Sequence, residues 1–100
     1  KVYPASMESE IVKVPGVQDV VFCAIPKDDG FYTPVCFIVP KKMDDAKEVK
    51  AAVEAFCAMK FSEDSCPKRV FIKEQIPLNK GNKPDILLLE QEAMNLYHQL

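Results

Sequence analysis

Residues 17–25 restrict the fold of this chain more than any other segment, because apolar side chains occupy both sides of an expected β-strand. The segment is rich in β-branched and aromatic residues, which favour strands. Alternate strand residues point to opposite faces, which groups Val20, Phe22 and Ala24 against Val21, Cys23 and Ile25. With apolar residues on both faces, we expect an interior strand.

A second strand is expected over residues 33–39, after turn-forming residues at positions 26–30. The two strands are predicted to form an antiparallel hairpin with a loop of several residues. Pro34 lacks a backbone N–H, so it is tolerable only near the start of its strand or on a sheet edge.

Two helical patterns flank the third expected strand. Asp44 or Asp45 can cap a helix whose apolar positions follow the 3.6-residue period, and Asp85 can cap a final helix. The apolar positions of the first are Ala46, Val49, Val53, Phe56 and Cys57. Those of the second are Ile86, Leu89, Ala93, Leu96, Tyr97 and Leu100. Between the two helices, residues 68–73 are expected to form a strand and residues 75–82 a loop.

The chain is expected to begin with a short amphipathic helix. Pro4 suits a first helical turn, and Met7, Ile11 and Val14 recur at helical spacing until Pro15 ends the pattern. The resulting order, α-β-β-α-β-α, predicts a small α+β sandwich with a mostly antiparallel sheet of three or more strands covered by helices. A length of 100 residues supports one domain over residues 1–100.

Charge and hydropathy exclude several classes of function. The 13 basic and 15 acidic residues are spread along the chain, so no nucleic-acid partner is expected. The longest apolar run, residues 20–25, is too short to span a bilayer, and no signal-peptide pattern is present. The four cysteines form no C-x-x-C pair and the only histidine is His98, so no metal site is expected. We expect reduced, mostly buried thiols in a cytoplasmic protein, with a disulfide as the alternative.

A series of short motifs recurs in the same order in a known family. The chain reads KVYPA at residues 1–5, PGV at 15–17, CPKRVFI at 66–72 and IPL at 76–78. This series resembles the C-terminal domain of adenylate-forming acyl-CoA synthetases, also called AMP-binding ligases, over essentially the whole chain. The VYP motif is more similar to acyl-CoA synthetases than to the adenylation domains of peptide synthetases.

The family's functional motif is a proline, a threonine two residues later, and Gly-Lys at positions five and six. Counted from Pro77, this sequence has Asn79, Asn82 and Lys83 at those positions. The resemblance therefore implies that Lys83 is the catalytic lysine and that Asn79, Gly81 and Asn82 form its supporting loop. Gly81 lies one residue before the family's glycine position, where it is expected to be a turn residue with positive φ.

Two further positions depart from the family, and three others acquire a role by resemblance. Pro84 follows the lysine where the family usually has a β-branched residue, and Ile86 stands where arginine is frequent. Lys1, Tyr3 and Pro4 are implied to lie just after the hinge between the two domains of the enzyme. Lys73 and Lys80 lie near Lys83 but outside the motif's spacing, so both are expected to be solvated surface charges.

The resemblance implies a mobile lid domain of an ATP-dependent, AMP-forming ligase. Lys83 would assist adenylation of a carboxylate, after which the domain would rearrange for thioester formation with coenzyme A or a carrier-protein thiol. ATP, Mg²⁺ and coenzyme A would be used by the full enzyme, and fatty acid metabolism is the implied setting. The larger N-terminal domain would bind them, so the isolated domain is expected to be inactive. The alternative is a stand-alone α+β binding or regulatory module without catalysis.

Overall fold

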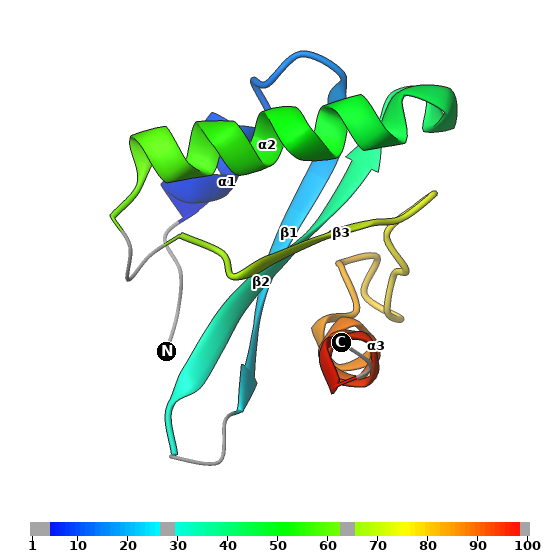
Figure 1. The fold of residues 1–100 in the computed structure, drawn as a ribbon. Helices are drawn as coiled ribbons and strands as arrows, with labels where there is room; N and C mark the ends of the chain where they lie inside the picture. Colours follow the sequence, from blue (N-terminus) through cyan, green and yellow to red (C-terminus); the bar gives the residue numbers. More distant parts are fainter. Residues whose placement is uncertain (1–4, 27–29, 63–65, 99–100) are drawn as a thin grey trace.

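The computed structural model describes residues 5–26, 30–62 and 66–98. Its elements follow in the order α1 (Ala5–Ile11), β1 (Val17–Pro26), β2 (Tyr32–Pro40), a 3₁₀ turn η1 (Met43–Asp45), α2 (Ala46–Lys60), β3 (Arg69–Ile72) and α3 (Ile86–His98). The predicted order α-β-β-α-β-α and the α+β class are confirmed (Figure 1).

Among the described residues, the three strands form one mixed sheet in the order β1-β2-β3. β1 pairs antiparallel with β2, which confirms the hairpin, while β3 pairs parallel with β2 over a shorter stretch. The expectation that residues 17–25 form an interior strand is wrong as regards sheet position, because β1 lies at an edge and β2 is central. Helix α2 carries the chain from β2 across to β3, the crossover that a parallel pair requires, so β2 acquires a neighbour on each side.

Helix α1 partly closes the exposed edge of β1. The backbone N–H of Phe22 donates to Glu8 Oε2 at 2.8 Å, and the N–H of Val20 donates to Asp19 Oδ1 at 2.9 Å. Unpaired N–H groups on an edge strand are open to pairing with other chains. The Glu8 carboxylate therefore satisfies a group that another strand would otherwise bind.

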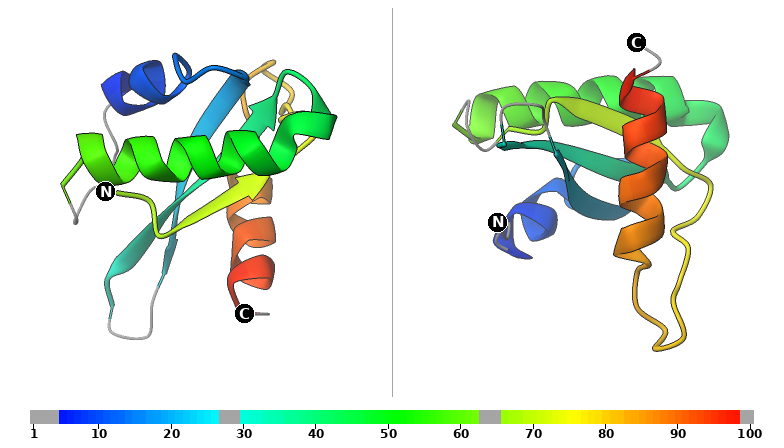
Figure 2. Two further views of the ribbon diagram at one scale, coloured as in Figure 1. Left: turned by 45° about the horizontal axis from the view of Figure 1, so that its top comes forward. Right: turned by 90° about the horizontal axis from the view of Figure 1, so that it is seen from below.

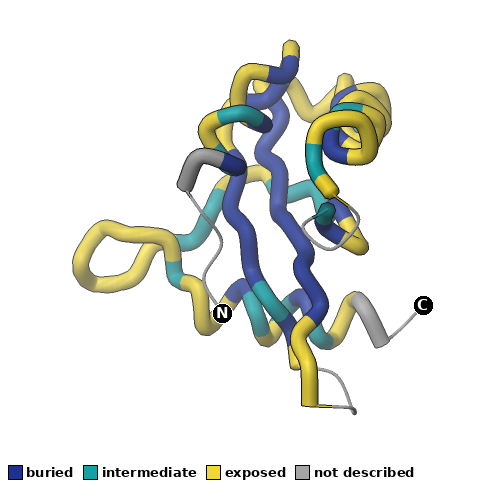
Figure 3. Tube along the Cα trace, turned by 90° about the vertical axis from the view of Figure 1, so that its left-hand side faces the viewer, coloured by how far each residue is buried: buried dark blue, intermediate teal, exposed yellow. Residues whose placement is uncertain are grey.

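Helices cover both faces of the sheet, which explains the two apolar sides of β1. Helices α1 and α2 lie on one face and α3 on the other (Figure 1). Val20 and Phe22 belong to the first core, whereas Val21, Cys23 and Ile25 belong to the second. Figure 3 shows the buried residues continuing along the adjacent strands between these layers.

A tight turn at Gly16 joins α1 to β1 beneath α2. Met7, Ile11 and Val14 are buried as predicted, and the N–H of Val17 donates to the carbonyl oxygen of Val14 at 3.1 Å. Gly16 has φ +92°, and a Cβ placed there would lie 2.7 Å from Cγ2 of Val49 in α2. Both the backbone conformation and the close approach of α2 therefore require glycine.

The two predicted caps differ in outcome. The backbone N–H of Leu88 donates to Asp85 Oδ1 at 3.2 Å, so Asp85 caps α3 as expected. Asp45 occupies the N-cap position of α2 but makes no side-chain capping bond. Its backbone, at φ −96° and ψ 8°, belongs to the preceding 3₁₀ turn rather than to the extended conformation that aims a capping side chain at the helix.

The buried face of α3 is narrower than predicted. Leu89 and Ala93 are fully buried, but Ile86 and Leu96 are exposed. The side chain of Tyr97 and all of Leu100 fall outside the described residues. The prediction assumed that one sheet face would cover the whole apolar stripe, whereas the β1–β2 face contacts the helix mainly along the row containing Leu89 and Ala93.

The cysteines are free, and three of them are buried as predicted. Burial raises the pKa of the Cys23 thiol to about 12, with Glu90 and then Glu8 adding to the effect. Burial likewise raises the pKa of Cys57 to about 12 and that of Cys36 well above its ordinary value. The fourth, Cys66, is half-buried against the α1–α2 core.

Candidate functional site

The segment between β3 and α3 extends away from the rest of the domain. β3 ends at Ile72 and α3 begins at Ile86, and the right-hand view of Figure 2 shows the connection, coloured yellow to orange, projecting beyond the helices and sheet. It contains the predicted loop and Lys83. A projecting segment of this kind can enter a cleft on another protein surface.

The tip of this connection is a small hairpin. The N–H of Asn79 donates to the carbonyl oxygen of Lys83 at 2.8 Å, and the N–H of Asn82 donates to that of Asn79 at 3.0 Å. Leu78 and Pro84 form an antiparallel bridge at its base. This pattern matches a three-residue hairpin loop, in which the residue after the turn adopts a left-handed conformation.

Asn82 adopts that left-handed conformation, with φ 63°. The expected positive φ at Gly81 is therefore wrong, because Gly81 is not among the positive-φ residues of the described chain. The hairpin requires left-handed geometry after the turn, and asparagine is one of the few non-glycine residues that adopt it readily. The special backbone position immediately precedes Lys83, which is where the family motif has its glycine.

The side chain of Asn79 closes the loop from inside. Its Oδ1 accepts hydrogen bonds from the N–H of Gly81 at 2.8 Å and from the N–H of Lys83 at 3.2 Å. Asparagine commonly organises turns by bonding to backbone groups two residues ahead. Asn79, Gly81, Asn82 and Lys83 thus form one structural unit, as the sequence predicted for the supporting loop.

Lys83 is exposed, and within the described part of the chain its ammonium group has no hydrogen bond or ion pair. Lys80 is also exposed, at the turn of the hairpin. The two lysines differ in backbone constraint, since the N–H and carbonyl groups of Lys83 are both bonded to Asn79. Lys83 is therefore presented from a fixed backbone with its charge available.

Lys73 differs from the expectation of a solvated charge. Its Nζ lies 2.7 and 2.9 Å from the two carboxylate oxygens of Glu92 in α3, and both residues are half-buried. The N–H of Lys73 also donates to the carbonyl oxygen of Ile38 in β2 at 2.9 Å. Sequence reasoning missed this pair because 19 residues separate its members and only the packing of α3 brings them together.

Both ends of the connection are thus anchored. Lys73 fixes the end at β3, and at the other end the N–H of Asp85 donates to the carbonyl oxygen of Pro77 at 2.8 Å. Asp85 is also the cap of α3. The hairpin, its base and the first turn of α3 are therefore linked, and displacement of α3 would displace Lys83.

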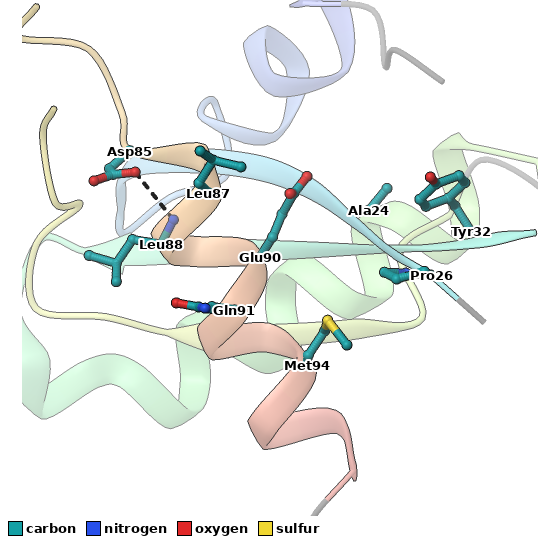
Figure 4. Close-up of a pocket in the computed structure, with 9 residues that line it drawn as sticks. All are labelled: Ala24, Pro26, Tyr32, Asp85, Leu87, Leu88, Glu90, Gln91 and Met94. Carbon is teal, nitrogen blue, oxygen red and sulfur yellow. Dashed lines mark hydrogen bonds between the residues drawn. The ribbon is translucent and has the colours of Figure 1, made fainter. Parts of the chain in front are cut away.

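A groove runs along α3 beside the base of the hairpin, with a volume of about 850 Å³. We call it the α3 groove. Figure 4 shows its two walls, one from the β1–β2 hairpin and the other from the outer side of α3. The first wall includes Pro26 and Tyr32, and the second includes Leu87, Leu88 and Met94. The groove is mainly apolar, although Asp85 and Glu90 add carboxylates to its lining.

Other predicted features are outside the site or outside the described residues. Lys1, Tyr3 and Pro4, expected near a hinge, lie outside the described residues. In the described chain, no group of three or more His, Cys, Asp or Glu side chains is placed to hold a metal ion. None of the described helices has the length and apolar character needed to cross a membrane.

Comparison with known families gives one match that covers most of the chain. The AMP-binding enzyme C-terminal domain matches residues 6–83, ending at the lysine of the hairpin. Among curated proteins, the long-chain-fatty-acid–CoA ligase FadD13 of Mycobacterium tuberculosis is 32% identical over 82 residues, which is 82% of this chain. The match spans only 16% of that relative, so most of the relative lies outside the matched domain.

Solved structures agree with this match. A fatty acyl CoA synthetase of Mycobacterium tuberculosis covers 94% of this chain with a TM-score of 0.76 and 27% identity. Apo MatB of Rhodopseudomonas palustris covers 96% with a TM-score of 0.81 and 25% identity. The superposed segments are 18% and 19% of those chains.

Proposed function

Because the chain belongs to the family of AMP-binding enzyme C-terminal domains, we propose that it is the lid domain of an ATP-dependent, AMP-forming acyl-CoA synthetase. In that enzyme Lys83 would assist adenylation of a carboxylate substrate. The observation that carries the proposal is the projecting hairpin, in which Asn79 and left-handed Asn82 hold the backbone of an unpaired Lys83. The fatty-acid substrates named for its relatives make a fatty acid the first substrate to test.

The chemistry of adenylation suits a single lysine at a loop tip. A carboxylate oxygen of the substrate bonds to the α-phosphorus of ATP, and the bond to the leaving pyrophosphate breaks. Negative charge is concentrated on neighbouring carboxylate and phosphate oxygens, which a compact ammonium group stabilises without a demand for bidentate geometry. Lys83 would supply that charge to the shared acyl and phosphate oxygens.

The second half-reaction would use a different arrangement of the same domain. A thiolate, from coenzyme A or a carrier protein, bonds to the acyl carbon while the bond to AMP breaks. Rotation of the domain would withdraw Lys83 and cover the reactive adenylate from water. ATP, Mg²⁺ and coenzyme A would be bound mainly by the N-terminal domain, since the described residues supply no phosphate loop and no metal-binding set. The free buried thiols suit the expected cytoplasmic setting.

Substitution of Lys83 in the full-length enzyme tests the proposal. Lys83→Ala should lower adenylate formation by about 100-fold or more, the effect of losing one strong electrostatic donor. Thioester formation from supplied acyl-adenylate should change little, because Lys83 would no longer be at the reacting atoms. The isolated domain should show no carboxylate-dependent pyrophosphate exchange.

Lys80→Ala is the matched control, since Lys80 is an exposed lysine of the same hairpin. It should leave both half-reactions nearly unchanged. Loss of adenylation in Lys80→Ala with normal adenylation in Lys83→Ala would show that the count from Pro77 is wrong. Normal adenylation in both variants would mean that this enzyme does not use the lysine, and the proposed role would fall.

A further inference from the structure

We propose that the α3 groove is the surface on which the N-terminal domain of the same enzyme docks while Lys83 is at the adenylation site. The inference rests on the proposed function. It adds which face of this domain meets the larger domain in that step, and which side chains make the contact.

The first observation is the distribution of apolar side chains around the start of α3. Leu89 faces the sheet and is fully buried, whereas Leu87 and Leu88 are 78% and 47% exposed. A helix that is apolar on all sides is normally buried on all sides. The sheet covers only one side of α3, so a second packing partner is expected for the opposite side.

The second observation is that the exposed side chains are gathered at one groove. Leu87 and Leu88 share its lining with Tyr32, which is 55% exposed and comes from the opposite wall (Figure 4). Single exposed leucines are ordinary, but apolar side chains gathered around a groove mark interaction sites. Aromatic and aliphatic anchors of this kind commonly form the centre of an interface.

The third observation is the connection between this groove and the lysine hairpin. Asp85 lines the groove, caps α3 and bonds to Pro77 at the base of the hairpin, two residues after Lys83. A protein surface that receives Lys83 would therefore lie next to the first turn of α3. In relatives of which this domain matches 16–19%, the remaining chain is large enough to provide that surface.

The charges of the groove indicate the chemistry of its occupant. Its charged lining residues are Asp85 and Glu90, and no lysine or arginine lines it. Phosphate groups of ATP or coenzyme A would be repelled. The docking surface should instead present an apolar side chain toward Leu87 and Tyr32, with a lysine or arginine near Glu90.

The test uses cysteine labelling of the full-length enzyme loaded with a non-hydrolysable acyl-adenylate analogue. Leu87→Cys should react with a maleimide probe at least about tenfold more slowly than Met59→Cys. Met59 is the matched control because it is 83% exposed but lies on α2, on the other side of the sheet. Native thiols give little background, since burial raises the pKa of Cys23 and Cys57 to about 12. Equal labelling of the two introduced cysteines would overturn the inference.

A second variant separates the inference from the proposed function. Leu87→Glu should lower adenylate formation about tenfold or more and leave thioester formation from supplied adenylate unchanged, while Met59→Glu changes neither step. If Lys83→Ala loses adenylation but Leu87→Glu does not, the docking surface is wrong and the lysine role stands. If Lys83→Ala adenylates normally, the lysine role is wrong, and protection of Leu87→Cys still decides whether the groove is covered.

Discussion

Asn79 should control how often the hairpin holds Lys83 in its productive position. Asn79→Ala removes the oxygen that accepts bonds from the N–H groups of Gly81 and Lys83. A hydrogen bond contributes about 0.5–1.5 kcal/mol net, and exposed bonds lie toward the lower end because water replaces them. Losing two should therefore destabilise the folded hairpin by about 1–2 kcal/mol, which corresponds to a factor of about 5–30 in its population.

That factor predicts the kinetics. Adenylate formation in the full-length enzyme should fall by about 5–30-fold in Asn79→Ala, because only the fraction with an ordered hairpin presents Lys83. The loss should be smaller than in Lys83→Ala, where the charge itself is absent. Thioester formation from supplied adenylate should be unaffected. Both half-reactions can be followed separately by pyrophosphate release and by thiol consumption.

Two variants show whether the hydrogen bonds cause the effect. Asn79→Asp keeps the acceptor oxygen and should adenylate faster than Asn79→Ala. Asn82→Gly should adenylate at least as fast as the unmodified enzyme, because glycine adopts the left-handed conformation without strain. Wild-type adenylation in Asn79→Ala, or equal losses in the alanine and aspartate variants, would refute the reasoning.

Three further predictions concern stability and reactivity. Gly16→Ala should destabilise the domain by about 2–4 kcal/mol through strain at φ +92° and overlap with Val49, seen as a fall in Tm of about 10 °C or more; Gly30→Ala, at φ +87° with no atom near the added Cβ, should cost about half as much. Glu92→Gln should weaken the pair with Lys73 and lower stability by about 1 kcal/mol, with partial recovery in the swapped Lys73→Glu, Glu92→Lys double variant; no change in Tm on thermal unfolding would show that the pair is not a brace. Native thiols should label slowly between pH 7 and 9, and stability should fall as pH rises from about 9 toward 12, because the unfolded chain loses thiol protons that Cys23 and Cys57 retain when folded; rapid native labelling of these two would contradict their burial.

Local sequence patterns predicted the elements because each pattern reflects one element's own packing. Met7, Ile11 and Val14 recur at helical spacing and are all buried, and the two apolar faces of β1 contact two different layers. Strand order could not be obtained in this way. An apolar strand at the sheet edge resembles a central strand when helices cover both its faces, as they do for β1.

The candidate site was predictable where spacing alone determines geometry. The distance in sequence from Pro77 to Lys83 identified the hairpin, and the tolerance of asparagine for left-handed backbone identified Asn82. The bonds from Asn79, the pair between Lys73 and Glu92, and the α3 groove depend on how the chain closes in three dimensions. No short-range pattern encodes them.

The two layers of the domain are packed unequally, and this bears on how a lid can move. In the described chain, twelve buried residues form the core under α1 and α2, whereas seven form the core under α3, which contributes only Leu89 and Ala93. Regions with fewer buried apolar contacts open at lower free energy. Helix α3 and its hairpin are therefore the part of the domain most dependent on outside contacts. Docking at the α3 groove would add packing there, so the hairpin would be most rigid while Lys83 is needed and looser when the domain turns away.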